Sequence, residues 1–316
     1  MKKIILIGEL CEDIIMHSPK SHMVLGKKIW AGDITITTGG SASYASQALA
    51  AMGENTKIFS VLGDDDSGKR ILRHLSNIES IDCSCIRSIS DEKTTRSIIV
   101  CDGHEKDFIG CSPMLKMDIP QVDQLEGIDL IYIAGYALYP ELWNENFITL
   151  LTVARSMGII IVLDCQLLPV DREDLAELIR FKEIIKVVDI ALFAEKETIN
   201  LFGSNDYTKA WEILYTYGFS KTVVFKKGAQ GCVVATCGTF CTVPQFETDV
   251  YDAVGAGDIF GAAFIYGVLQ QWEQIQCAKY ASVYTALCLG KYEETKNYPE
   301  VSEVMNILEN NRRNEQ

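Results

Sequence analysis

The sequence lacks the long apolar segments that mark membrane proteins. No apolar stretch reaches the roughly 18 residues that a membrane-spanning helix requires. The apolar run Ile4–Ile7 follows Lys2-Lys3 but ends at Gly8-Glu9, which is too short for the hydrophobic part of a signal peptide. We therefore expect a cytoplasmic protein without a membrane segment, and Ile4–Ile7 indicates a buried first strand.

Positive charge is also scarce. The chain has 29 Lys and Arg against 43 Asp and Glu, which gives a formal net charge of −14. No basic run is longer than a pair, such as Arg312-Arg313. Because nucleic acids are bound mainly through clustered Lys and Arg, this balance argues against a nucleic-acid partner. An anionic ligand would need a local group of donors instead.

Metal-binding and disulfide patterns are missing as well. The 11 cysteines include no Cys-x-x-Cys pair, and the nearest approach to one is Cys83-x-Cys85. The four histidines show no ligand spacing such as His-x-x-x-His. We therefore expect neither a zinc site nor a disulfide framework. Cysteines in apolar runs, such as Cys232, are expected to pack as small hydrophobic residues.

What the sequence does contain is an alternation of short apolar runs and helical patterns. Continuous apolar runs rich in Ile and Val are typical of strands buried on both faces of a parallel sheet. They occur at Ile4–Ile7, Lys57–Val61, Leu130–Ile133, Ile159–Leu163, Ile190–Phe193 and Thr222–Phe225. Helical patterns lie between and after them, at Ser43–Met52, Gly68–Leu75, Trp143–Met157, Leu175–Phe181, Thr208–Tyr217 and Asp258–Trp272. This order predicts an α/β fold with a doubly wound, mainly parallel sheet flanked by helices.

Two segments interrupt that alternation. Residues 12–37 and 92–111 show a period of two without an intervening helix, and the second indicates a hairpin that turns at Asp102-Gly103. We expect these two segments to form a small inserted β-sheet that acts as a lid. The α/β core would then consist of residues 1–11, 38–91 and 112–316.

The segment with the most chemical information runs from Asp252 to Asp258, with the sequence Asp-Ala-Val-Gly-Ala-Gly-Asp. Its glycines precede an apolar helical run, so a helix should begin near Asp258 and offer its free N–H groups and dipole to an anion. A carboxylate at this point would repel an anion. It suits a base that takes a proton from an attacking hydroxyl. The alternative is that Asp258 is only the N-cap of the helix.

Two other glycine-rich segments could either bind a ligand or have a structural role. Gly39-Gly40 opens a helix of small residues, which allows backbone to approach either a ligand or the sheet closely. The segment Gly63–Arg70 imitates a phosphate-binding P-loop. Arg70, however, stands where a P-loop has its magnesium-binding Ser or Thr, and the aspartates within the segment would repel phosphates. We therefore reject the P-loop interpretation.

In this order, the Gly-Gly helix start near residue 40 and the Asp-x-x-Gly-Ala-Gly-Asp segment resemble the two signatures of the ribokinase-type (PfkB) carbohydrate kinase family. Further matches are Gly8, Asp13, the turn Gly63-x-Asp65-x-x-Gly68 and the run Gly228-x-x-Gly231. The resemblance extends over nearly the whole chain. It implies transfer of the γ-phosphoryl group of Mg-ATP to a hydroxyl of a small sugar or sugar acid. It also implies a homodimer formed through the lid.

The resemblance assigns roles to particular residues. The catalytic group would be Asp258 as base with the N–H groups of Gly255, Ala256 and Gly257. The acceptor would be bound by Asp13, Gly39, Gly40, Tyr44 and Asp258. The nucleotide would be bound by Glu197, Lys226, Gly228, Gly231 and Ser282. Asp252 would hold a monovalent cation, potassium in many members, unless it is only a turn residue. Glu197 would organise magnesium through water.

Several positions depart from the family pattern and leave the acceptor open. Ala194 and Tyr44 each replace an Asn, Gln166 and Leu168 replace an Asn and an Arg, and Ser282 replaces an Asn. Because Tyr44 could stack on a base, a nucleoside or pseudonucleoside kinase is an alternative. A sugar-binding regulator that has lost turnover is another, supported by Ala194. Trp30 and Phe108 in the lid segments are candidates for a partner contact, for the apolar face of the sugar, or for packing onto the core.

Overall fold

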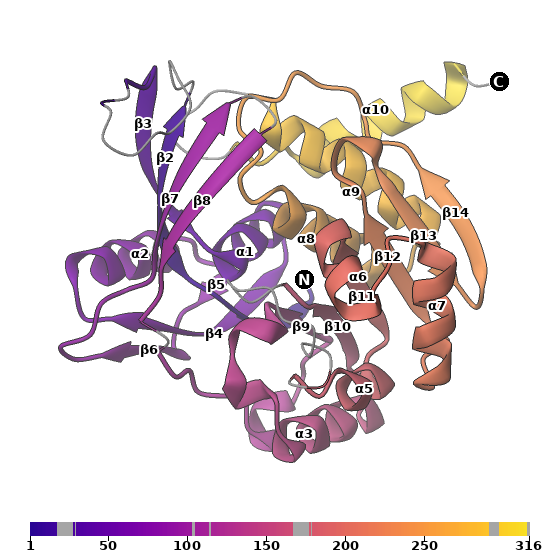
Figure 1. The fold of residues 1–316 in the computed structure, drawn as a ribbon, viewed down its shortest axis with the longest axis horizontal. Coiled ribbons are helices and arrows are strands. Elements are labelled where there is room, and N and C mark those ends of the chain that lie inside the picture. Colours follow the sequence, from indigo (N-terminus) through magenta and orange to yellow (C-terminus); the bar gives the residue numbers. More distant parts are fainter. Residues whose placement is uncertain are drawn as a thin grey trace.

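The computed structural model describes residues 1–17, 28, 30–102, 105–113, 115–166, 177, 179–290 and 297–314. A ten-stranded sheet passes through the molecule (Figure 1), with the order β14-β13-β12-β11-β10-β9-β1-β4-β5 and with β6 beside β4. Its parallel strands are β1 (Lys3–Gly8), β4 (Asn55–Gly63), β5 (Ile81–Asp82), β6 (Ile86–Ile89), β9 (Leu130–Ala134), β10 (Ile160–Asp164), β11 (Ile190–Ala194) and β12 (Thr222–Lys226). Two antiparallel strands extend one edge, β13 (Cys232–Thr236) and β14 (Thr239–Val243).

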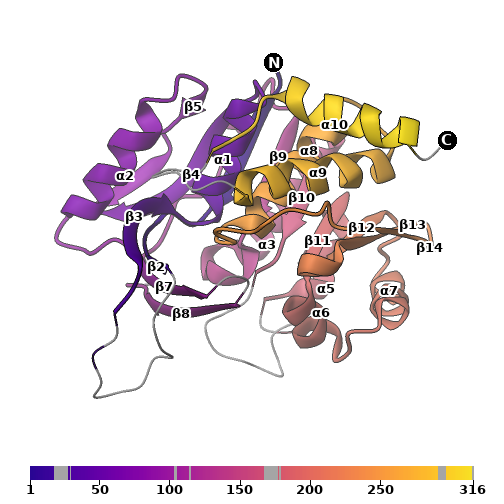
Figure 2. The same cartoon turned by 90° about the horizontal axis from the view of Figure 1, so that it is seen from above.

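Helices cover both faces of this sheet (Figure 2). One face carries α1 (Ser41–Ala51), α2 (Asp66–Ser76), α8 (Ala256–Leu269), α9 (Gln274–Leu289) and α10 (Val301–Asn314). The other carries α3 (Glu145–Ser156), α5 (Phe181–Ile184), α6 (Glu195–Phe202) and α7 (Tyr207–Thr216). Short 3-10 turns complete the connections: η1 (Val122–Leu125), η2 (Tyr136–Leu138), η3 (Pro140–Leu142), η4 (Ile185–Val187) and η5 (Gly228–Gln230).

The first strand shows why this arrangement follows from the sequence. Ile4 and Leu6 pack into the core under α1 and α8, whereas Ile5 and Ile7 pack into the core on the opposite face. All four side chains are at most 1% exposed. A continuous apolar run is required because successive side chains of a strand point to opposite faces, and both faces are covered here. The predicted doubly wound α/β fold is confirmed.

Some helix boundaries differ from the predicted ones for local reasons. The helix expected from Trp143 begins at Glu145, because the side chain of Asn144 accepts a hydrogen bond from the N–H of Phe147 at 3.0 Å and caps it. The helix expected from Asp258 begins two residues earlier, at Ala256. The helices α6, α9 and α10 were not predicted. Most of the helix expected over Leu175–Phe181 lies outside the described residues.

A separate four-stranded sheet, here called the lid, stands over one side of the core (Figure 1). Its order is β3-β2-β7-β8, formed by β2 (Cys11–His17), β3 (Asp33–Gly39), β7 (Arg96–Asp102) and β8 (Glu105–Cys111). The predicted turn at Asp102-Gly103 falls between β7 and β8, where Asp102 pairs with Glu105; Gly103 lies outside the described residues. The strand register gives the lid an inner face with Asp13 and Phe108 and an outer face with Ile14 and Ile36.

The segment that imitates a P-loop has a structural role at the base of the lid. Asp65 is the N-cap of α2 and accepts a hydrogen bond from the N–H of Gly68 at 3.0 Å. It also accepts one from the hydroxyl of Thr94 at 2.7 Å and pairs with Arg96 of β7 at 3.1 Å. These contacts join α2 to the lid.

In the part of the chain that the structure describes, no helix combines the length and the apolar character needed to cross a membrane.

Candidate active site

The segment before α8 forms a tight loop at the carboxyl edge of the sheet. Gly255 is the N-cap and has a φ of 73°, a left-handed conformation that disfavours residues with a Cβ. A Cβ at Gly255 would also lie 2.6 Å from the ring of Tyr44. Ala256, Gly257 and Asp258 form the first turn of α8. The interpretation of Asp258 as an N-cap is therefore wrong: Asp258 is the third residue of the helix, within its first turn and at the positive end of its dipole.

A side chain that follows strand β10 is hydrogen-bonded to Asp258. Gln166 Nε2 donates a hydrogen bond to Oδ1 of Asp258 at 3.2 Å. Gln166 follows β10 and has a φ of 55°, so a left-handed turn directs it back over the strand ends. Asp258 itself is half-buried. The sequence marked Gln166 only as a departure from the family pattern, because nothing along the chain connects residues 92 positions apart.

Beside the loop lies a buried group of charges. Lys226 at the end of β12 donates to Oδ2 of Asp164 at 2.6 Å, and Asp164 is 1% exposed. Burial opposes the charge of Lys226, but Asp164 and then Glu197 outweigh it and raise the pKa of its ammonium group. Burial and the charge of Asp164 raise the pKa of Glu197 to about 7. Lys226 thus remains a cation next to the loop, and its Nζ lies 3.6 Å from where a Cβ of Gly257 would lie.

Glu197 is bonded to the backbone at the start of α6. Its carboxylate accepts a hydrogen bond from the N–H of Ala194 at 2.8 Å, which caps α6, and the residue is 7% exposed. Ala194 pairs in the sheet with Lys226. The position that lacks the family's Asn is therefore adjacent to a lysine.

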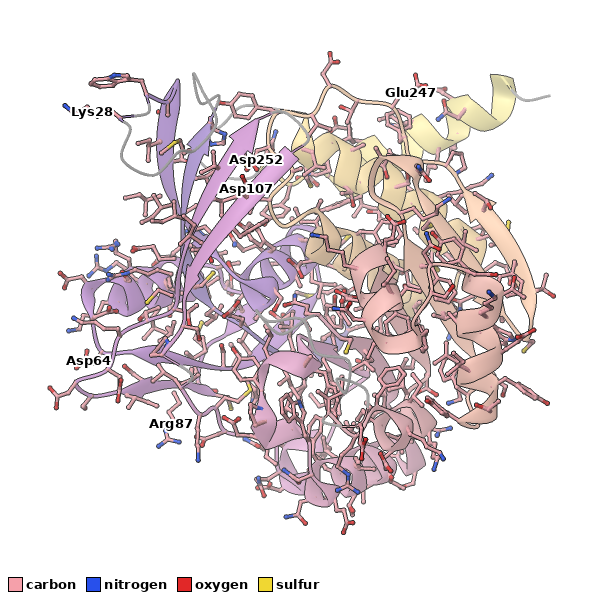
Figure 3. The ribbon with its side chains drawn as sticks, viewed as in Figure 1. Lys28, Asp64, Arg87, Asp107, Glu247 and Asp252 are labelled. Carbon is pink, nitrogen blue, oxygen red and sulfur yellow. The ribbon has the colours of Figure 1, made fainter. Side chains whose placement is uncertain are left out.

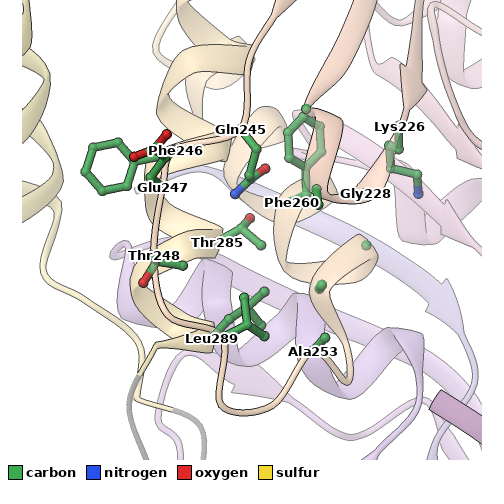
Figure 4. A pocket seen from close by; sticks show the side chains of 15 residues that line it. Lys226, Gly228, Gln245, Phe246, Glu247, Thr248, Ala253, Phe260, Thr285 and Leu289 are labelled. Carbon is green, nitrogen blue, oxygen red and sulfur yellow. The ribbon is translucent and has the colours of Figure 1, made fainter. Parts of the chain in front are cut away.

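A cavity of about 530 Å³ opens on the other side of this loop (Figure 4). Three of the predicted nucleotide-binding residues line it, namely Lys226, Gly228 and Gly231, together with Ala256 and Gly257 of the first turn of α8. Apolar side chains of Phe246, Val250, Phe260 and Leu289 form much of the remaining wall. A cavity with the Lys226 ammonium group and the first turn of α8 at one end, and apolar walls elsewhere, suits a nucleoside triphosphate.

Ser282 does not line this cavity. Its hydroxyl accepts a hydrogen bond from the N–H of Phe246 at 2.8 Å and donates to the carbonyl of Pro244 at 3.2 Å. It faces a neighbouring hollow of about 710 Å³ between β14, α9 and α10. Its connection to the 530 Å³ cavity is therefore indirect, through Gln245 and Phe246, which line both hollows.

On the opposite side of the loop lie the residues predicted to bind the acceptor. Asp13 is 3% exposed, and Tyr44 donates its hydroxyl proton to Oδ2 of Asp13 at 2.7 Å. Burial is the main reason why the pKa of Asp13 is raised. Protein fills the space beside both glycines of the pair: a Cβ at Gly39 would strike the carboxylate of Asp13, and one at Gly40 would strike Glu9. The two glycines thus permit close backbone contact at this point.

Glu9 is a site residue that we did not predict. It follows β1 directly, and burial together with the charges of Asp13 and Asp258 raises the pKa of its carboxyl to about 7. Its position after Gly8 was a usable signal, because ligands of open α/β sheets bind beyond the carboxyl ends of the strands.

The lid meets the loop that precedes α8. The rings of His17 in β2 and Tyr251 are 5.2 Å apart. Asp252, the next residue, is labelled in Figure 3 close to the lid residue Asp107. Its Oδ1 accepts a hydrogen bond from the N–H of Val254 at 2.8 Å, so it also stabilises the turn.

The two lid aromatics are largely exposed. Trp30 is 69% exposed and lies outside the strands, and Phe108 is 58% exposed on the inner face of the lid. Leu168, which departs from the family pattern, lies outside the described residues.

Comparisons with known proteins identify the family of the chain. The model of the pfkB family carbohydrate kinases matches residues 1–300. The chain belongs to that family. A 5-dehydro-2-deoxygluconokinase of Clostridium botulinum is 21% identical over 295 residues, covering 85% of this chain and 83% of the relative.

Two solved structures share the fold of this carbohydrate kinase. The ribokinase of Arabidopsis thaliana, complexed with ribose and ATP, has a TM-score of 0.75 at 19% identity and covers 98% of this chain and 99% of its own. A nucleoside kinase of Methanocaldococcus jannaschii has a TM-score of 0.71 at 20% identity, with coverage of 98% and 99%. The predicted family and the predicted enzyme class, a carbohydrate kinase, are confirmed.

Proposed function

We propose that this carbohydrate kinase transfers the γ-phosphoryl group of ATP to a hydroxyl of a small sugar or sugar acid, with Asp258 as the general base. The observation that carries the proposal is the position of Asp258. It is a half-buried carboxylate in the first turn of α8, oriented by Gln166, between the 530 Å³ cavity and the group formed by Glu9, Asp13 and Tyr44. The name of the Clostridium relative supports a sugar-type acceptor.

The residues divide the reaction between them. The oxygen of the acceptor hydroxyl forms a bond to the γ-phosphorus, and Asp258 accepts the proton of that hydroxyl. The bond from that phosphorus to the bridging oxygen breaks, and ADP leaves. Lys226 and the first turn of α8 face the charge that develops on the transferred group. Gln166 fixes the orientation of the base by its hydrogen bond.

The chain also offers oxygen ligands for magnesium. Oδ1 of Asp164 is buried without a hydrogen-bond partner in the described part of the structure, and the Glu197 carboxylate lies in the same charged group. No set of three or more His, Cys, Asp or Glu side chains among the described residues forms a metal site by itself. This fits magnesium, which is commonly held by one or two carboxylates, water and the phosphates of the substrate. Bound there, it would neutralise phosphate charge.

We also propose potassium at Asp252. This rests on the resemblance to kinases in which the matching acid holds a monovalent cation. The hydrogen bond from Val254 shows that Asp252 has a role in the turn as well.

The role of Asp258 has a direct test. Asp258→Asn should lower kcat at least about 10²-fold, because loss of a general base typically costs 10²–10⁴-fold. ATP affinity, measured by calorimetry, should remain within a few fold. Asp66→Asn is the matched control, because Asp66 is an exposed carboxylate in the first turn of another helix, α2. Near wild-type turnover of Asp258→Asn would refute the assignment.

A nucleoside acceptor is the second candidate, since a nucleoside kinase shares the fold. Stacking of a base on Tyr44 does not support it, because Tyr44 is 3% exposed and its hydroxyl is bonded to Asp13. ADP release measured with sugars, sugar acids, polyols and nucleosides would distinguish the two. A regulator without turnover would release none.

A homodimer through the lid is a further part of the proposal. One row across the outer face consists of four isoleucines in register: Ile36, Ile14, Ile98 and Ile109. Ile36 is 62% exposed and Ile109 48%. Apolar side chains at this density on an exposed sheet are typical of an interface.

A further inference from the structure

One buried hydroxyl in the wall of the 530 Å³ cavity has no partner among the described residues. It belongs to Thr285 of α9, which is 4% exposed and lines this cavity. A threonine within a helix commonly bonds back to a carbonyl of the preceding turn, and a buried hydroxyl that makes no bond costs free energy. The Oγ1 of Thr285 therefore lacks a partner that a ligand of the cavity would supply.

A second polar group lines the same cavity. Nε2 of Gln245 donates a hydrogen bond to the carbonyl of Ser282 at 3.3 Å. Because a carbonyl can only accept, this bond fixes the orientation of the amide and leaves Oε1 of Gln245 as an acceptor. Among the described residues no donor is bonded to that oxygen. Ser282 and Thr285 are three residues apart on one face of α9, and Figure 4 shows Gln245 and Thr285 pointing toward one another, well away from Lys226.

Ser282 also fixes the backbone on both sides of Gln245. Its hydroxyl accepts from the N–H of Phe246 at 2.8 Å and donates to the carbonyl of Pro244 at 3.2 Å. The side chain of Gln245 thus starts from a fixed backbone and ends in an oriented amide. Ser282 does not line the cavity, so it acts through Gln245 as a positioning residue.

We propose that Gln245 and Thr285 bind the base of the nucleotide, and that Gln245 selects a base with an exocyclic amino group. This inference rests on the proposed kinase function and names the residues that determine its choice of nucleotide. Lys226 and the first turn of α8 would take the phosphates, which leaves the base for the part of the cavity with Gln245 and Thr285.

The selection follows from the hydrogen-bonding groups of the bases. The 6-amino group of adenine donates to Oε1 of Gln245. The 6-oxo group of hypoxanthine or guanine only accepts, so it would face that oxygen without a bond. The hydroxyl of Thr285 both donates and accepts, so it adds affinity for either kind of base without selecting between them.

Calorimetry with ATP and ITP tests the proposal, because adenine carries an amino group where hypoxanthine carries an oxo group. The wild type should bind ATP about 10- to 100-fold more tightly than ITP, since ITP leaves two acceptors facing each other. Gln245→Leu removes the protein acceptor and should bring the two affinities within about threefold of each other. Gln276→Leu is the control, because Gln276 of α9 lines the neighbouring hollow and not this cavity, and it should keep the wild-type ratio.

The hydroxyl of Thr285 has its own test with a matched control. Thr285→Val keeps the shape of the side chain and should weaken the binding of ATP and ITP alike by about three- to tenfold. Its melting temperature without ligand should stay the same or rise, because an unpartnered buried hydroxyl is removed. Thr56→Val is the control: Thr56 of β4 also has a buried Oγ1 without a partner in the described part of the chain, but does not line the cavity. It should show the same melting behaviour with unchanged affinity.

The role of Ser282 is separated from a merely structural one by kinetics. Ser282→Ala should raise the KM for ATP several fold and lower the ratio of ATP to ITP affinity, while kcat stays close to that of the wild type. Equal binding of ATP and ITP by the wild type, or a ratio that Gln245→Leu leaves unchanged, would overturn the inference. Selective binding of ATP without phosphoryl transfer to any acceptor would instead support it and count against the kinase proposal alone.

Discussion

Two glutamates three residues apart have opposite electrostatic environments. Glu9 lies among carboxylates, and burial with the charges of Asp13 and Asp258 raises its pKa to about 7. Glu12 is also buried, but hydrogen bonds from Arg70 and Ser67 outweigh that burial and lower its pKa. Glu9 therefore faces the site as an acid that is half-protonated near neutral pH, while Glu12 is a fully ionised anchor of the lid.

This difference predicts opposite effects on stability. Because the native state holds a proton on Glu9 up to about pH 7 and the unfolded chain releases it near 4.5, stability falls as the pH rises between these values. Glu9→Gln should remove this decrease in stability with pH. The variant should therefore be more favourable relative to the wild type at pH 8 than at pH 5. Urea unfolding at the two pH values measures it.

Glu12→Gln is the matched control with the opposite sign. The stabilisation from ionised Glu12 is present above about pH 4.5 and is lost as the pH falls through the lowered native pKa. Its loss should therefore destabilise the protein at pH 8. If Glu9→Gln showed the same pH dependence as the wild type, Glu9 would not titrate as its surroundings indicate.

Among single residues, the sequence could predict those that belong to a local motif. Gly255 and Asp258 lie within one short segment, so their relation to a helix start is readable along the chain. The same holds for Gly228 and Gly231, which lie within one short segment and line the 530 Å³ cavity. Gln166 and Glu9 reach the site only through the order of the strands. Tyr44 was identified, but its bond to Asp13 depends on side-chain packing that no spacing encodes.

At the scale of elements, strands were easier to predict than helices. Each of the six apolar runs corresponds to a strand, because burial on both faces leaves a continuous signal. The helix α9 was missed, since side chains around much of its circumference are buried and its pattern lacks a polar face. The strands β13 and β14 were missed as well; the residues of β14 are largely exposed.

The end of β12 carries a prediction on catalysis. Lys226→Gln should lower kcat by about 10²-fold with a small change in acceptor KM, because it removes a cation that faces the developing charge. Lys227→Gln is the control, since its ammonium group lies over the ring of Tyr207 at 5.7 Å instead. Its kcat should stay within about twofold of wild type in steady-state assays.

Removal of Lys226 also leaves the buried Asp164 without its charge partner, which destabilises a protein by about 3–5 kcal/mol. The double variant Lys226→Gln/Asp164→Asn should recover much of that stability in thermal melts. It should not recover kcat, because it lacks Lys226 and also Asp164, the carboxylate that we propose as a magnesium ligand. Recovery of both would mean that Lys226 serves only to neutralise Asp164.

For the whole molecule, the outer face of the lid predicts the assembly. We expect a dimer at micromolar concentration in sedimentation, because the isoleucine row needs a partner surface. Ile36→Glu should give a monomer with an almost unchanged melting temperature, since Ile36 is 62% exposed in the single chain. Tyr215→Glu changes an exposed aromatic residue on α7, 66% exposed, and should leave the dimer intact. A monomeric wild type would refute the interface.

The connections of the lid have a consequence for the entropy of substrate binding. Only Glu9 and Leu10 lie between β1 and β2, and only Gly40 lies between β3 and α1. The two connections touch, since the N–H of Ala42 donates to the carbonyl of Glu9 at 3.0 Å. Fixing the backbone of one residue costs roughly 1–2 kcal/mol of conformational entropy. With so few backbone dihedrals free at these two connections, closure of the lid over an acceptor, which we propose, would order little additional chain there.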